Sequence, residues 1–227
     1  MSSDDLPFRG VRAAIFDMDG TLVDSEPFTG HSVLAELRAA DVDDPDLDTT
    51  RYYGCTWQSI ATDLVQRHPR LAGRCTPESL DARFRRIWQE SPPPPIPGML
   101  RAIEAAGAHL ATAIATSSHR GSVDDLFARL DVGRHFDAVV SAEDYERSKP
   151  DPQCFVLAAR RLGVEPADCV VFEDSIAGLT AARAAGAKVV AVTHRSPEVQ
   201  RARSLADLAV ADYDELPERF FERISSQ

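Results

Sequence analysis

Two carboxylates one residue apart follow an apolar run near the start of the chain. Residues 11–16 are apolar except for Arg12, and residues 17–21 read DMDGT. A short apolar run bounded by turn residues is typical of a buried strand of a parallel sheet. Open α/β sheets place their chemistry at the carboxyl ends of such strands. One aspartate could attack a substrate while the other exchanges a proton, although a polar turn without chemistry would show the same residues.

Hydroxyl side chains follow the second expected strand. Residues 109–115 form a small apolar run, and Thr116, Ser117 and Ser118 come next. Hydroxyls and backbone N–H groups suit the oxygens of a phosphoryl group. The serines could instead cap the following helix. Both functions can hold if Ser118 caps the helix while Thr116 faces a site.

A lysine and two adjacent carboxylates follow the next two strands. The two prolines of residues 147–152 exclude a helix there and predict an extended backbone around Lys149. A lone lysine is usually a solvated charge, but a fixed one could neutralise a phosphate. Glu173 and Asp174 follow the apolar residues 169–172. Adjacent carboxylates at an apolar strand end are costly unless a cation lies between them, and oxygen ligands suit Mg²⁺.

The elements around these residues form two blocks. Residues 28–90 show helical spacing without a strand pattern, and the five prolines of residues 91–97 predict a stiff linker. The helices expected in the first block span 28–40, 57–66 and 78–90. The helices expected after it span 99–106, 121–130, 152–162, 176–185 and 217–224, and the strands 109–115, 136–140, 169–172, 187–192 and 208–210. Alternation of strands and helices predicts a parallel sheet covered on both faces, with the first block inserted after strand one.

Composition argues against several classes of partner. The 227 residues carry 25 basic and 36 acidic side chains, a net charge of −11, so no nucleic-acid partner is expected. No apolar run reaches membrane-spanning length, and the acidic residues 1–5 do not resemble a signal peptide. The four cysteines form no C-x-x-C pair, and Cys154 and Cys169 fall in apolar surroundings. We expect a reduced, cytoplasmic protein without a membrane partner, and a monomer.

Taken together, the strand ends resemble the motifs of a known family. The matching segments are residues 17–26 (DMDGTLVDSE), 116–118 (TSS), 148–150 (SKP) and 173–178 (EDSIAG). They are similar, in order, to the four motifs of the haloacid dehalogenase superfamily, in its phosphatase and β-phosphoglucomutase-like branch. The resemblance implies an α/β fold with a Rossmann-like parallel-sheet core, residues 1–25 and 92–227. It also implies an inserted α-helical cap of four-helix type, residues 26–91, hinged near residues 24–27 and 91–97.

The resemblance also implies a role for each matching residue. Asp17 would attack phosphorus and become an aspartyl phosphate, and Asp19 would protonate the leaving oxygen and then activate water. Thr116, with neighbouring groups such as Ser117, would hold the phosphoryl group, and Lys149 would balance charge. The implied cofactor is Mg²⁺, and its implied ligands are Asp17, the backbone carbonyl of Asp19, Asp174 and Glu173, the last either directly or through a water. A carboxylate approaching a phosphate dianion needs such cations to cancel repulsion.

The chain differs from some members of this branch at residues that bear on the choice of substrate. Haloacid dehalogenases lack the second aspartate, and Asp19 is present here. β-Phosphoglucomutases typically carry a cap arginine shortly after a glycine to hold a second phosphate; here Trp57 stands at that place, after Gly54. Arg120 could substitute for that arginine. Trp57 could pack a sugar or belong to the core of the cap.

We therefore expect a Mg²⁺-dependent phosphomonoester hydrolase acting on a small phosphorylated metabolite, with a sugar phosphate favoured. Two alternatives stay open at this stage. One is a phosphosugar mutase of the same architecture. The other is a non-catalytic phosphate-binding protein on the same fold, although the intact Asp17, Asp19, Lys149 and Asp174 argue against it.

Overall fold

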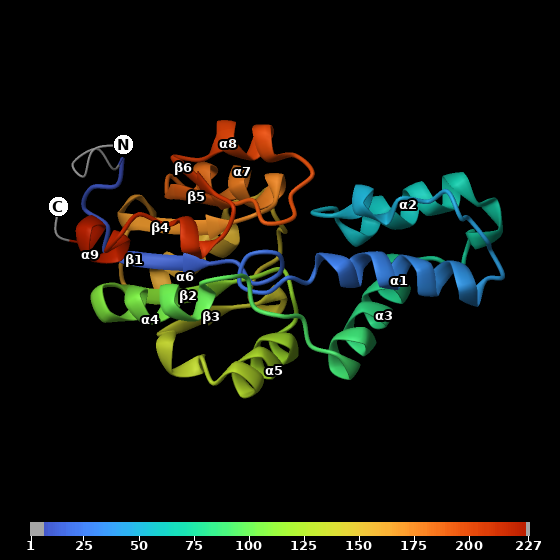
Figure 1. The fold of residues 1–227 in the computed structure, drawn as a ribbon, viewed down its shortest axis with the longest axis horizontal. Coiled ribbons are helices and arrows are strands. Elements are labelled where there is room, and N and C mark those ends of the chain that lie inside the picture. Colours follow the sequence, from blue (N-terminus) through green and yellow to red (C-terminus); the bar gives the residue numbers. More distant parts are fainter. Residues whose placement is uncertain (1–6, 226–227) are drawn as a thin grey trace. The chain divides into compact units, whose positions relative to one another are not determined.

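The computed structural model describes residues 7–225, and the larger of its two compact units is built on a six-stranded, all-parallel sheet (Figure 1). The strand order is β3-β2-β1-β4-β5-β6. The strands are β1 (Ala13–Phe16), β2 (Ala111–Ala115), β3 (Ala138–Val140), β4 (Cys169–Glu173), β5 (Lys188–Val192) and β6 (Leu208–Val210). The acidic residues 1–5 lie outside the described part of the chain.

Helices cover both faces of the sheet, as the alternating pattern predicts. On one face α6 (Gln153–Arg161), α7 (Ile176–Ala184) and α8 (Val199–Leu205) pack on the strands. On the other face α4 (Met99–His109) packs on β2 and on the terminal α9 (Phe220–Ser225) (Figure 1). Helix α5 spans Arg120–Leu130. No described helix is long and apolar enough to cross a bilayer.

A second compact unit, Asp24–Pro94, contains helices but no sheet strand. Its helices are α1 (Glu26–Ala39), α2 (Trp57–Arg67) and α3 (Pro77–Glu90), joined by two short 3₁₀ turns. The expected four-helix count is therefore wrong, because residues 49–52 and 69–71 form only single 3₁₀ turns. Helix α3 begins with a reciprocal capping box between Thr76 and Ser79, and Pro77 occupies its first position.

Several predicted boundaries in the sheet unit are wrong; for example, β3 begins at Ala138 and α9 at Phe220, later than expected. Gly107 does not end its helix, and α4 continues to His109, so β2 begins only at Ala111. The burial of α4 side chains such as Ala106 outweighs the roughly 1 kcal/mol helix cost of one glycine. Helix α8 was not predicted, since its seven residues include few apolar positions. Gly163 and Gly186, by contrast, follow α6 and α7 with φ of +71° and +85°, as helix-ending glycines should.

The register between β1 and β4 brings their carboxyl ends together. Phe16 pairs with Phe172, and the Asp17 backbone N–H donates to the Phe172 carbonyl at 3.0 Å. Strands β2 and β3 extend the sheet on one side of β1, and β4 to β6 extend it on the other. The chain therefore reverses direction across the sheet between β1 and β4, the position where open α/β sheets form their sites.

Candidate active site

Three buried carboxylates meet at the carboxyl ends of β1 and β4. Asp17, Glu173 and Asp174 each offer an oxygen atom, and these atoms lie within 4.8 Å of one another. Asp17 and Glu173 are 5% and 1% exposed, because each directly follows or ends a fully buried strand. Residues far apart in the sequence thus form one cluster, as the motif spacing predicts.

Lys149 joins this cluster from the segment before α6. Its Nζ donates to Asp17 Oδ1 at 2.5 Å and to Glu173 Oε1 at 2.7 Å. The expected extended backbone is wrong: Lys149 and Pro150 lie in a turn, closed by the Asp151 N–H donating to the Ser148 carbonyl at 3.1 Å. That turn directs the lysine to the strand ends. One buried ammonium therefore contacts two of the three carboxylates.

The cluster carries more negative than positive charge. Burial raises the pKa of Asp17 to about 8, and Glu173 and Asp19 add to this while Lys149 opposes it. Burial also disfavours a charged Lys149, but Asp17 and Glu173 outweigh that effect and hold its pKa well above the ordinary value. The arrangement is therefore costly without further positive charge.

The carboxylate oxygens of this cluster suit a divalent cation that prefers oxygen ligands. All the side-chain ligands offered are carboxylate oxygens, which Mg²⁺ prefers, and they converge within reach of one ion. A divalent cation would also offset the unfavourable burial of Asp17. Asp17, Glu173 and Asp174 would hold such an ion.

The loop after β1 packs directly on Asp174. The Thr21 hydroxyl, fully buried, donates to Asp174 Oδ1 at 2.9 Å. Gly20 has φ of +76°, and a Cβ there would lie 2.2 Å from Asp174 Oδ2. Gly20 is thus needed both for the turn and for the close approach of the carboxylate. Thr21 lies inside the first matched motif, but its partner could not be read from spacing.

Glu173 is held in a similarly tight setting. The Ser175 N–H and hydroxyl both donate to Glu173 Oε2, at 2.7 and 3.0 Å. Ser175 also caps α7, accepting from the Gly178 N–H at 3.0 Å. A Cβ on Gly178 would lie 1.8 Å from Glu173 Oε1, so glycine leaves room for this carboxylate.

Asp19 is held by the segment after β2. The Ser118 hydroxyl donates to Asp19 Oδ2 at 2.6 Å. The alternative in which Ser118 caps α5 is wrong: the N-cap is His119, whose side chain makes no capping hydrogen bond, and the Ser118 hydroxyl donates to Asp19 instead. Thr116 is buried, and its Oγ1 accepts from the Ser118 N–H at 3.0 Å.

Tyr145 was not identified from the sequence, although it contacts the candidate phosphate-binding segment. Its hydroxyl lies 3.1 Å from the Thr116 carbonyl, to which it donates, and 3.3 Å from Ser117 Oγ. These contacts tie residues 116–117 to the segment that leads to Lys149. An aromatic residue between two motifs is too common for the sequence alone to indicate this role.

Arg120 does not present a free guanidinium. Its Nε donates to Asp124 Oδ1 at 3.1 Å along α5, and the side chain is 53% exposed. Its backbone N–H donates to Glu143 Oε2 at 3.1 Å, and His119 Nδ1 lies 2.9 Å from Glu143 Oε1. Arg120 would have to leave Asp124 to bind a second phosphate.

Gly54 and Trp57 lie in the helical unit. Gly54 has φ of +70°, and its N–H donates to Glu26 Oε1 at 2.9 Å. Trp57 is the first residue of α2 and is partly buried, with its ring edge-on to Phe84 at 5.5 Å between centroids. The ring therefore belongs in part to the core of the helical unit, one of the two interpretations of this residue.

Comparison with known proteins gives concordant results. The family model described as haloacid dehalogenase-like hydrolase matches residues 11–186. Hexitol phosphatase B from Escherichia coli strain K12 is 31% identical over 219 residues, covering 92% of this chain and 95% of that protein. Fructose-1-phosphate phosphatase YqaB from the same strain is 33% identical over 187 residues, covering 78% and 94%. A crystal structure of a putative β-phosphoglucomutase from Thermotoga maritima superimposes with a TM-score of 0.71, at 27% identity, covering 95% and 99%.

Proposed function

The chain belongs to the haloacid dehalogenase-like hydrolases, and we propose that within this family it is a Mg²⁺-dependent phosphatase of small sugar phosphates. The observation that carries the proposal is the buried cluster of Asp17, Glu173 and Asp174 with Lys149. The phosphatase names of its relatives, hexitol phosphatase B and fructose-1-phosphate phosphatase, support a phosphorylated sugar or sugar alcohol as substrate. The intact set of residues argues against a non-catalytic binding protein.

Asp17 is the proposed nucleophile. Its carboxylate attacks phosphorus and displaces the sugar alkoxide, forming an aspartyl phosphate, which water then hydrolyses to regenerate the carboxylate. Lys149, 2.5 Å from Asp17 Oδ1, offsets the negative charge that accumulates as the carboxylate meets the phosphate. A bound Mg²⁺ supplies further positive charge for the same purpose. Thr116 and Ser117 hold the phosphoryl oxygens.

Asp19 is the proposed acid and base. In the first half-reaction its carboxyl group protonates the leaving oxygen, and in the second it takes a proton from the attacking water. The Ser118 hydroxyl, 2.6 Å from Asp19 Oδ2, fixes the direction of this carboxylate. One residue can therefore serve both steps from one position.

The helical unit, Asp24–Pro94, is proposed to be the cap that carries substrate selectivity. Gly54 and Trp57 are the residues of this unit proposed to contact the sugar. We further propose that the enzyme acts in the cytoplasm as a monomer, on a metabolite and not on a nucleic acid or membrane.

The test is phosphate release from a panel of phosphorylated metabolites with Mg²⁺ present. The panel contains hexitol phosphates, fructose 1-phosphate, β-glucose 1-phosphate and phosphoglycolate. We expect turnover of at least one sugar or sugar-alcohol phosphate, and none by Asp17→Asn. Asp174→Ala should lower Mg²⁺ affinity by orders of magnitude, because it removes a charged ligand. Full activity of Asp17→Asn would refute the covalent mechanism.

A mutase is the second candidate, favoured by the structural likeness to a putative β-phosphoglucomutase. A mutase must hold the distal phosphate of its bisphosphate intermediate, which a cap arginine does through paired, charge-assisted hydrogen bonds. Trp57 offers one N–H and no charge, and Arg120 is engaged by Asp124. We therefore expect β-glucose 1-phosphate with a trace of the 1,6-bisphosphate to yield inorganic phosphate or nothing. Faster accumulation of glucose 6-phosphate than of phosphate would establish the mutase.

A further inference from the structure

A tyrosine stands among phenylalanines beside the strand ends that carry the carboxylates. The Tyr213 ring lies 6.4 Å from that of Phe16 and 5.8 Å from that of Phe172, the residues directly before Asp17 and Glu173. The neighbouring rings that complete the cluster come from Phe8, Phe136, Phe220 and Phe221. The neighbouring positions are packed by phenylalanine, so packing alone does not explain why residue 213 carries a hydroxyl group.

The hydroxyl of Tyr213 is buried without a hydrogen-bond partner among the described residues. The whole residue is 5% exposed. A buried hydroxyl without a partner costs free energy that phenylalanine would avoid. A group outside the protein chain is therefore the expected partner.

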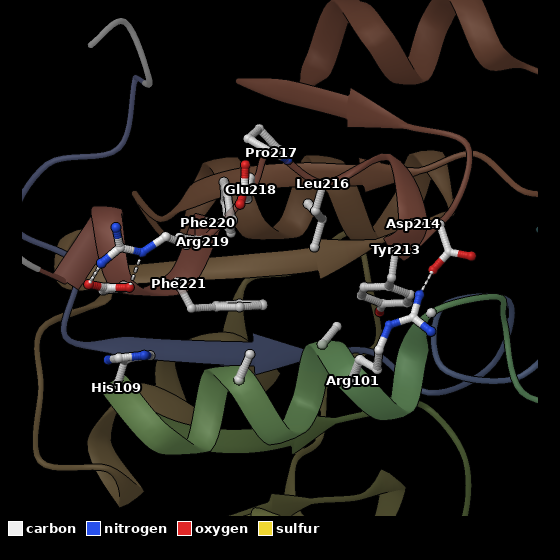
Figure 2. Close-up of a pocket in the computed structure, with 14 residues that line it drawn as sticks. Arg101, His109, Tyr213, Asp214, Leu216, Pro217, Glu218, Arg219, Phe220 and Phe221 are labelled. Carbon is white, nitrogen blue, oxygen red and sulfur yellow. Dashed lines mark hydrogen bonds and ion pairs between the residues drawn. The ribbon is translucent and has the colours of Figure 1, made fainter. Parts of the chain in front are cut away.

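Solvent in the adjacent groove does not reach this hydroxyl. A groove of about 410 Å³ runs along α4, with Tyr213 near the start of the helix and His109 at the opposite end (Figure 2). The Tyr213 ring forms part of its lining, but the hydroxyl oxygen itself is buried. At that end of the groove, Asp214 forms an ion pair with Arg101 and does not bond the Tyr213 hydroxyl. A hydrogen-bond partner for this hydroxyl must therefore lie in the interior of the protein.

The charged groups that act on the hydroxyl belong to the proposed cation site. Burial raises the pKa of the Tyr213 phenol well above its ordinary value, and the negative charges of Asp17 and Asp174 add to this. The phenol therefore keeps its proton and can donate a hydrogen bond. The backbone at Tyr213 is anchored by its own N–H, which donates to the Pro97 carbonyl at 3.1 Å. The ring is thus held in place by packing and by its main chain.

We propose that Tyr213 is a positioning residue of the cation site, whose hydroxyl donates a hydrogen bond to the hydration shell of the ion held by Asp17 and Asp174. The inference rests on the proposed Mg²⁺-dependent function. Mg²⁺ keeps several of its waters when it is bound by carboxylates, and such waters need hydrogen-bond partners from the surrounding protein. The Tyr213 hydroxyl supplies one such hydrogen-bond partner from within the phenylalanine cluster.

The test is Mg²⁺ binding to the full-length, metal-free protein, measured by isothermal titration calorimetry. Tyr213→Phe should raise the Kd about tenfold, the lower end of the effect typical for groups that support metal ligands. In metal chelator, the same variant should be at least as stable to urea as the wild type, because it loses only an unpartnered hydroxyl. Weaker Mg²⁺ binding without lost stability is a combination that a purely structural role would not produce.

Tyr52→Phe is the matched control. Tyr52 is also buried, at 3% exposed, but its hydroxyl donates to Asp63 Oδ2 at 2.6 Å within the helical unit. This variant should lose stability and keep the wild-type Kd for Mg²⁺. An unchanged Kd in Tyr213→Phe would overturn the inference, as would a variant that unfolds or loses stability in chelator. Absence of Mg²⁺ binding by the wild type would overturn the proposed function, and this inference with it.

Discussion

Replacing Asp17 by asparagine should stabilise the metal-free protein, even though the change removes the proposed nucleophile. Burial raises the pKa of Asp17 from 3.8 to about 8 in the folded protein. A carboxyl group with a raised pKa contributes its stability below the unfolded value and loses it as the pH rises toward the folded value. Stability of the wild type should therefore fall between about pH 4 and pH 8 through this group, and asparagine removes that dependence.

The size of the effect follows from the interval between the two pKa values. The interval between the unfolded pKa of 3.8 and pH 7 is roughly 3.2 pH units. At about 1.36 kcal/mol per unit, the wild type loses about 4 kcal/mol of unfolding free energy over this interval. Lys149 also contacts an amide instead of an ionisable carboxyl group in the variant, and side chains and water rearrange around a buried group that ionises. Both effects reduce the gain, so we expect about 1–3 kcal/mol at pH 7. The gain should vanish near pH 4 and be largest near pH 8.

Urea unfolding in chelator at pH 5, 7 and 8 measures this gain directly. Asp46→Asn, on an exposed loop, is the control and should change stability by less than about 0.5 kcal/mol. Saturating Mg²⁺ should narrow or reverse the difference, because the ion stabilises only the form that binds it. A variant less stable than the wild type at pH 7, or a gain that is the same at pH 5 and pH 8, would show that the pKa of Asp17 is not raised by burial.

Three further predictions follow from the geometry of the site. Gly178→Ala should lower the free energy of unfolding in urea by at least about 2 kcal/mol and abolish phosphate release, because the new Cβ would overlap Glu173. The control is Gly121→Ala, where a Cβ meets nothing within 4 Å, and this variant should be neutral or stabilising. Equal stability of the two variants would contradict this account of Glu173. Ser118→Ala should lower kcat about 10- to 100-fold with little change in KM and shift the pH–rate profile, because Asp19 loses its 2.6 Å hydrogen bond; an unaltered profile would remove Ser118 from the mechanism. Chelation should stop phosphate release from any accepted substrate and added Mg²⁺ should restore it, whereas activity persisting in excess chelator would exclude the metal.

Local patterns in the sequence were sufficient for the framework of the catalytic unit. The apolar run before Asp17 and the one before Glu173 predict β1 and β4, because a short apolar stretch ended by polar residues has few other folded forms. Glycine marks the end of α6 and of α7, since positive φ is a property of single residues. The candidate residues at these strand ends were therefore predictable before any contact was known.

Side-chain partners were decided by the tertiary structure. Ser118 fits a helix cap in sequence, yet its hydroxyl bonds Asp19, ninety-nine residues away along the chain. Lys149 lies in a turn rather than an extended segment, and that turn brings it to both Asp17 and Glu173. Gly107 remains helical because packing of α4 outweighs its weak local preference.

Tyr213 illustrates the same division most clearly. In sequence it is one aromatic residue in an acidic stretch near the C-terminus, without a spacing that links it to any motif. In the fold its ring packs on Phe16 and Phe172, and its buried hydroxyl lies within the influence of Asp17 and Asp174. Backbone preference acts over a few residues and can be read along the chain. The surroundings of a buried polar atom depend on which distant segments pack around it, and only the folded chain determines them.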